Sequence, residues 1–207
     1  MAEFPASPVP AEEFVEQLLP RLLGPPALAA GAAGLRARLG FVLSGKGGGA
    51  WTLVLRSKGL EVEAGADAPL TLGLSAKDWR GALWEQRGGA LGAFVAEALG
   101  AGQDSPSIEG PLRFDLAVIE KLADLDATVR LAVREEGGVD WCMDLRLGAG
   151  PVAREPQVAV CATTEDLQAL VSRDLEPLAA VMTGRVQVEG EMALLIQIHA
   201  LLRQARS

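Results

Sequence analysis

The chain has 207 residues, of which 49% are hydrophobic and 22% are charged. This balance is typical of a globular protein with a buried core and excludes a disordered chain. The formal net charge is −8, and no basic patch is evident along the sequence, so we expect no nucleic-acid partner and no attraction to an anionic membrane surface.

The first ten residues, MAEFPASPVP, are rich in proline, and we predict a loose tail over residues 1–10. They lack the basic start and the apolar run of a signal peptide, and no stretch of the sequence is apolar for long enough to cross a bilayer. We therefore expect a cytoplasmic protein without stable membrane insertion. Apolar residues at helical spacing then predict a helix from residue 11, which Pro20 should kink or end.

The stretch SGKGGGAW, residues 44–51, could be a phosphate-binding loop or a tight turn between two strands. A P-loop needs a Gly-Lys-Ser/Thr triplet followed by a helix. Here Gly47 follows Lys46, and the next residues, AWTLVLRS, have the bulky and β-branched side chains of a strand. Apolar residues also alternate before the turn. The pattern therefore predicts a β-hairpin whose glycines supply the positive φ angles of its turn.

Two further strands are expected near residues 59–63 and 69–74. Ser75 is placed as the N-cap of a following helix, with Asp78 three residues on. A second helix follows, and Pro111 begins a third helix that has a single apolar stripe.

The order of elements then starts again, which indicates an internal repeat. Residues 128–147 indicate a second hairpin of strand, glycine turn and strand. Trp141 has the position in it that Trp51 has in the first hairpin. QVAVCATTEDLQAL repeats PLTLGLSAKDWRGAL, an alternating strand followed by a hydroxyl N-cap and a helix. VQVEGEMALLIQIHALL repeats SIEGPLRFDLAVIEKLADL, a strand ending in Glu-Gly before a long apolar helix.

Because the three matches occur in the same order, we predict an α+β fold of two tandem units, residues 11–123 and 124–207. Each unit should hold an antiparallel sheet of about five strands with helices on one face. The second copy of the glycine turn lacks the lysine, which again favours a hairpin over a phosphate loop.

Residues 182–202, MTGRVQVEGEMALLIQIHALL, resemble the closing segment of the type-two sterol carrier protein domain, the non-specific lipid-transfer fold. In that family a Gly-x-hydrophobic-x-hydrophobic-x-Gly strand precedes an apolar C-terminal helix, and Gly184, Val186, Val188 and Gly190 stand at those places. The resemblance covers residues 128–203 and reaches residues 12–125 more faintly, since AGQDSPSIEG replaces the glycine-led strand in the first copy.

The resemblance implies a non-enzymatic protein that holds a fatty acid, acyl-CoA, sterol or isoprenoid in a hydrophobic tunnel between sheet and helices. Strand alternation places this ligand in the second unit, with the last helix covering it. Methionines suit a pocket that adapts to flexible chains, although the same side chains would also suit a dry core. The predicted lining residues are Trp141, Met143, Leu145, Val158, Val160, Met182, Val186, Val188, Met192, Leu195 and Ile196.

Nothing in the sequence indicates catalysis or a cofactor. The single histidine, His199, lies in an apolar helix, and no cluster of His, Cys, Asp or Glu has the spacing of a metal site. The helix near residues 191–203 is apolar on two faces, whereas packing on a sheet needs only one. Its second face could contact a lipid, the other unit or a second subunit. The alternative to a lipid carrier is therefore an assembly module with filled cavities, which forms a homodimer or binds a protein partner through this helix.

Overall fold

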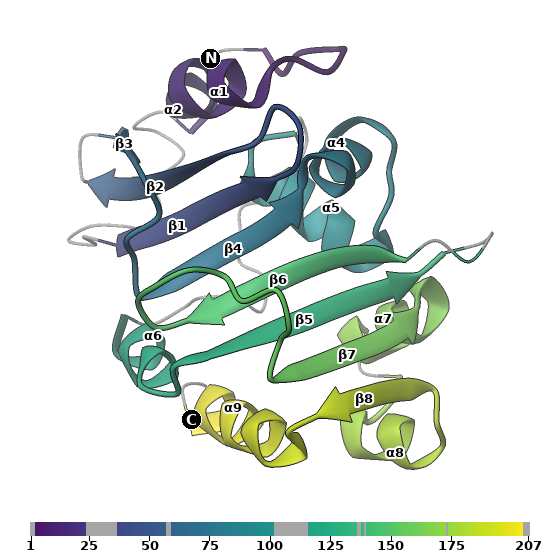
Figure 1. The fold of residues 1–207 in the computed structure, drawn as a ribbon. Coiled ribbons are helices and arrows are strands. Elements are labelled where there is room, and N and C mark those ends of the chain that lie inside the picture. The colour runs from purple at the N-terminus through teal and green to yellow at the C-terminus, as the bar shows by residue number, and fades with distance from the viewer. Residues whose placement is uncertain are drawn as a thin grey trace.

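The computed structural model describes residues 3–23, 37–56, 59–101, 116–135, 138, 140–172 and 174–204. Within this part of the chain, helices pack against one face of a single eight-stranded sheet (Figure 1). The α+β class predicted from the sequence is therefore confirmed. The predicted SIEG strand and the start of the helix at Pro111 lie outside the described residues.

The strands lie in the order β3-β2-β1-β4-β6-β5-β7-β8. Neighbours are antiparallel, except that β4 is parallel to β1 and β7 is parallel to β5. The strands are β1 (Ala37–Ser44), β2 (Gly49–Arg56), β3 (Gly59–Ala64), β4 (Leu70–Ser75), β5 (Ala127–Arg134), β6 (Trp141–Leu147), β7 (Val158–Thr163) and β8 (Val186–Gly190).

This sheet differs from the two antiparallel sheets of about five strands that the sequence predicts. The halves join through the antiparallel pair β4–β6, in which Leu72 lies opposite Leu145. Each of these strands would otherwise be the open edge of its own sheet, and pairing them satisfies the backbone groups of both. The result is one mixed sheet.

The helices are α1 (Ala11–Glu13), the π-helix η1 (Phe14–Leu18), α2 (Leu19–Leu22), α4 (Ala76–Trp84), α5 (Gly89–Ala98), α6 (Leu116–Ala123), α7 (Thr164–Val171), α8 (Pro177–Met182) and α9 (Met192–Gln204). Both predicted hydroxyl N-caps are present. The Ser75 hydroxyl accepts a hydrogen bond from the Asp78 N–H at 2.9 Å, and the Thr163 hydroxyl accepts one from the Asp166 N–H at 3.1 Å.

Pro20 does not end the first helix. The Leu19 N–H donates to the carbonyl of Phe14, five residues back, and the chain stays helical to Leu22. A proline has no N–H to donate, and the wider π-turn before it accommodates that loss without breaking the helix.

The glycine stretch forms the predicted hairpin. β1 and β2 pair as far as Leu43 and Gly49, and the turn between them holds Gly45 at φ +92° and Gly47 at φ +74°.

The strand orders β2-β1-β4 and β6-β5-β7 are alike, and so are their directions. Trp51 and Trp141 lie on the matching strands β2 and β6, but not in matching register. Trp51 faces Phe41, whereas Trp141 faces Val133, at the pair beside the turn. Trp141 is the first residue of β6, whereas Trp51 is the third residue of β2.

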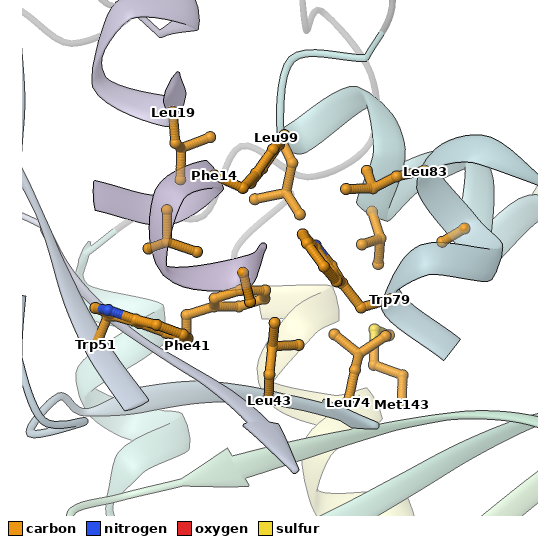
Figure 2. Packing of buried hydrophobic residues seen from close by; sticks show 14 of the residues in the cluster. Phe14, Leu19, Phe41, Leu43, Trp51, Leu74, Trp79, Leu83, Leu99 and Met143 are labelled. Atoms are coloured by element: carbon orange, nitrogen blue, oxygen red, sulfur yellow. The ribbon is translucent and has the colours of Figure 1, made fainter. Parts of the chain in front are cut away.

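The largest core cluster draws on both halves. Figure 2 shows Phe14 and Leu19 from the N-terminal helix and Phe41 from the sheet packed with Trp79 of α4. Trp141 of β6 belongs to the same cluster and donates its Nε1–H to the Asp78 carbonyl at 2.8 Å. The predicted boundary between residues 123 and 124 therefore does not separate two cores.

Residues 3–10, which the sequence predicts as a loose tail, make contacts with the core. The Phe4 ring lies 5.9 Å from the ring of Phe14 and 5.7 Å from that of Trp84, and Trp84 Nε1 donates to the Pro5 carbonyl at 2.9 Å. One aromatic side chain and one well-placed acceptor are enough to dock this proline-rich segment on the core.

We predict that Gly88→Ala destabilises the protein by about 3 kcal/mol or more. Gly88 has φ +83°, and a methyl group there would lie 2.6 Å from the Trp141 ring. Gly138→Ala is the control, because Gly138 has φ +74° but no heavy atom within 4 Å of such a methyl group. It should cost only about 1–2 kcal/mol. Urea denaturation measures both losses, and equal losses would contradict the packing of Trp141 on Gly88.

Candidate functional site

The two faces of the sheet differ in chemistry. On the face without helices, Arg130 pairs with Asp144 at 2.7 Å, and the segment 148–157 crosses the strands (Figure 1). This segment is held by a hydrogen bond of 3.3 Å from the Ala153 N–H to the Thr128 hydroxyl. The helix-bearing face is built from aliphatic and aromatic side chains, so it is the face that suits an apolar ligand.

Six aliphatic side chains in the middle of the helix-bearing face are only partly buried. They come from six consecutive strands of the sheet. We name them the mid-sheet row, and in strand order they are Leu39, Leu72, Leu145, Leu131, Val160 and Val188.

The mid-sheet row runs without a break from β4 to β8. Leu72 lies opposite Leu145, and Val160 lies between Leu131 and Val188 on the neighbouring strands. Leu145 and Leu131 are diagonal neighbours across the β5–β6 pair, within reach of each other on one face. The five side chains from β4 to β8 therefore form one continuous apolar surface. Leu39 of β1 lies diagonal to Leu72, whose direct partner on β1 is the buried Phe41.

Two groups of helices bound the row. Figure 1 shows α4, α5 and α7 behind one end of the strands and α6 and α9 at the other end. The strand residues under the first group are buried, as are those under the second. The first set includes Leu43, Leu74, Val133 and Met143, and the second includes Leu70, Val129, Leu147 and Val158.

The row thus lies where the core clusters meet. Leu39 and Leu131 pack against the clusters at both ends of the strands, and Val188 packs against two clusters as well. Exposed apolar surface costs about 25 cal/mol per Å². A contiguous apolar strip that is left partly open is a surface that a ligand or another protein could cover.

The row ends at β8, and the helices on either side of that strand carry exposed apolar side chains. Met182 at the end of α8 is 80% exposed, and Ile196 of α9 is 62% exposed. Leu178 and Met192 are also exposed. The second apolar surface that the sequence predicts for the last helix is therefore present at Met192 and Ile196.

The predicted lining residues fall into three groups by burial: partly buried, buried and exposed. Leu145, Val160 and Val188 belong to the row, and Leu195 of α9 is partly buried in the adjoining cluster. Trp141, Met143, Val158 and Val186 are buried in the core, while Met182, Met192 and Ile196 are exposed.

Sequence reasoning missed Leu39, Leu72 and Leu131 as members of the row. Their alternation with neighbouring residues could have shown which face they occupy. It could not show that β4 pairs with β6, or that the helices leave the middle of the sheet partly uncovered.

Asp166 ties α7 to the start of β8. Its carboxylate accepts a hydrogen bond from the Thr163 hydroxyl at 2.8 Å and one from Arg185 Nε at 2.6 Å. Both hydrogen bonds lower the pKa of Asp166 below its usual value, and the one from Thr163 has the larger effect. Arg185 immediately precedes β8, so the pair fixes the strand at which the row ends.

Among the described residues, no group of three His, Cys, Asp or Glu side chains could hold a metal ion. Of the helices in this part of the chain, none has the length and hydrophobicity to span a membrane. His199 is exposed on α9.

We predict that Asp166→Asn lowers the free energy of unfolding at pH 7 by up to about 1 kcal/mol. Because the folded pKa of Asp166 is lowered, its contribution is complete above the unfolded pKa of about 3.9 and is lost as the pH falls through the folded value. The difference between parent and variant should therefore shrink in urea denaturation at pH 3. Glu165→Gln, in the same helical turn, is the control. If Asp166→Asn lowers the free energy of unfolding equally at both pH values, a stabilising role for the ionised Asp166 is contradicted.

Residues 112–203 match the model of the SCP-2 sterol transfer family. Curated relatives include stomatin-like protein 1 of Mus musculus, 41% identical over 68 residues, and hydroxysteroid dehydrogenase-like protein 2 of Homo sapiens, 33% identical over 75 residues. The two matches cover 30% and 34% of this chain, and the chain spans only 17% and 18% of the length of these relatives.

Solved structures of sterol carrier proteins also match. The sterol carrier protein domain 2 of Helicoverpa armigera is 26% identical with a TM-score of 0.34, over 42% of this chain and 74% of that chain. Sterol carrier protein 2 of Yarrowia lipolytica, in its apo form, is 19% identical with a TM-score of 0.31, over 42% and 73%. The match to the family model confirms the predicted resemblance to the sterol carrier family for residues 112–203, and it does not extend into residues 11–111.

Proposed function

We propose that this protein binds an apolar, chain-like lipid along the mid-sheet row and has no catalytic role. The observation that carries the proposal is the row itself, in which aliphatic side chains stay partly open at the centre of the helix-bearing face. From β1 to β8 the row crosses about 24 Å, given the spacing of neighbouring strands. This distance is comparable to the length of an extended long-chain fatty acid.

The family match supports this proposal. Residues 112–203, which match the SCP-2 sterol transfer family, contain Leu131, Leu145, Val160 and Val188 of the row. The name of that family describes the transfer of a largely apolar molecule. Fatty-acyl and isoprenoid chains suit the row because they can lie along a narrow apolar strip with few polar contacts.

We further propose that the two halves are copies of one unit. The like strand orders β2-β1-β4 and β6-β5-β7 support a repeat, as do the helices capped by Ser75 and Thr163 that follow β4 and β7. In this proposal the first half extends the lipid surface of the second with Leu39 and Leu72.

The absence of catalysis is part of the proposal. The match to hydroxysteroid dehydrogenase-like protein 2 covers 18% of that protein, so its name carries no activity over to this chain. A cytoplasmic location remains a prediction as well.

A structural or assembly module is the second candidate function. It is favoured by the exposed Met182 and Ile196, because large apolar side chains in water are typical of contact surfaces between proteins. A homodimer or a protein partner would then cover α8 and α9.

We predict that Val160→Phe weakens the binding of a naturally fluorescent polyene fatty acid at least ten-fold, because the larger ring fills the row. Ala159→Phe is the matched control, since Ala159 is the preceding residue of β7 and points to the opposite face. Near-UV circular dichroism checks that both variants fold. Failure of the parent to bind, or equal binding by both variants, would refute the lipid site at the row.

We predict that Ile196→Glu leaves fatty-acid affinity within about two-fold of the parent, since Ile196 is exposed on α9. In the assembly alternative, the same change should instead convert an oligomer to a monomer in analytical ultracentrifugation. Native mass spectrometry of protein from its own host completes the comparison. A stoichiometric lipid supports carriage, and a lipid-free oligomer supports assembly.

A further inference from the structure

The β1–β2 turn lies beside α4 at one end of the strands (Figure 1). Residues of this turn and of α4 line an open hollow of about 330 Å³. Part of its lining comes from the glycine-rich stretch 44–51. Its lining residues are Ser44, Gly45, Lys46, Ser75, Ala76, Lys77, Arg80 and Glu85.

The hollow gathers positive charge in a chain whose net charge is −8. Of the described residues that line it, Lys46, Lys77 and Arg80 are cationic and Glu85 is acidic. With the described residues these three cations make no ion pair. The nearby Asp78 accepts a hydrogen bond from the Ser75 hydroxyl at 2.7 Å and lies 3.9 Å from Arg87.

This arrangement is unfavourable for the protein alone. Lys77 stands in the first turn of α4, where the helix dipole favours an anion and disfavours a cation. Like charges around one hollow also repel each other. An anion bound in the hollow would reverse both effects.

The fold does not require these cations. The helix α7 follows β7 as α4 follows β4, and its Thr163 cap corresponds to Ser75. Counted from the caps, Glu165 and Gln168 stand where Lys77 and Arg80 stand in α4. At these two positions the second half builds the same strand-to-helix junction without a cation.

We propose that this hollow binds the phosphate group of a phosphate monoester. Three cations and one carboxylate leave a net charge of about +2, which matches the charge of about −1.5 to −2 of such a phosphate at pH 7. Ammonium and guanidinium groups form strong, charge-assisted hydrogen bonds to phosphate oxygens. The N–H groups of Ala76 and Lys77, in the first helical turn, have no acceptor within the helix and can add to them.

The site is independent of the proposed lipid surface, because it lies outside residues 112–203 and outside the mid-sheet row. The stretch 44–51 is a hairpin turn, as its sequence predicts, and it also serves as one wall of an anion site. The phosphate could be carried by a soluble metabolite or by a lipid headgroup, which share this chemistry.

The test is a titration of the isotope-labelled protein with glycerol 3-phosphate, followed by amide chemical shifts. Saturable shifts confined to residues 45–48 and 76–80 are expected, with an affinity that falls as salt rises. Lys77→Gln and Arg80→Gln should each weaken binding at least ten-fold. Lys121→Gln is the matched control, because it removes the same charge from the exposed face of α6 and should change nothing.

A second measurement tests whether weaker binding is caused by unfolding of the variant. Without ligand, Lys77→Gln should be at least as stable to urea as the parent, since it removes a cation from a helix N-terminus. A parallel arm uses vesicles of phosphatidylcholine with and without phosphatidic acid. Binding of glycerol 3-phosphate supports a soluble source, and binding to the phosphatidic acid vesicles alone supports a headgroup. No saturable binding of either probe, or equal weakening by Lys77→Gln and Lys121→Gln, would overturn the proposal.

Discussion

The antiparallel pairing of β4 with β6 is the constraint on which the rest of the structure depends. It places Leu72 opposite Leu145 on the helix-bearing face and Gly73 opposite Asp144 on the other. Without it, each half would present an unpaired strand edge to solvent. The mid-sheet row would also be cut at its centre, because Leu72 and Leu145 are the link between the two halves. One strand pair thus creates both the single sheet and the continuous apolar strip.

Side-chain contacts hold this joint from the helix side. Glu135, after β5, accepts a hydrogen bond from the Gly88 N–H at 2.8 Å and pairs with Arg87 at 2.6 Å. The hydrogen bond to Glu135 is the main cause of a raised pKa for Arg87, so the guanidinium stays charged. Trp141 adds its hydrogen bond to the Asp78 carbonyl. Residues 112–203 match the sterol carrier family, yet part of their core is completed by α4 and α5 of the first half.

Sequence patterns predicted the structural features that depend on short-range interactions. The alternation of β1 and β2, the turn glycines and the Ser75 cap were all readable, because each depends on residues close in sequence. The β4–β6 pairing was not readable, since it joins segments far apart and no short pattern encodes a partner strand. The candidate site likewise contains residues that the sequence predicted correctly and residues that it did not. Val160 and Val188 were predicted from alternation, but Met182 was assigned to the pocket and lies exposed on α8, a helix that the alternation of β8 does not foretell.

The position of the row also explains why occupancy and stability should be coupled. The buried clusters at the two ends of the strands share no buried member, and Leu39 and Leu131 are partly buried side chains that pack against both. Surface left open between two clusters contributes little to holding them together. A chain-like ligand in the row would contact both clusters at once and would bury this surface. Because such a ligand binds the folded state alone, it would raise the free energy of unfolding of the whole sheet in proportion to the logarithm of its concentration.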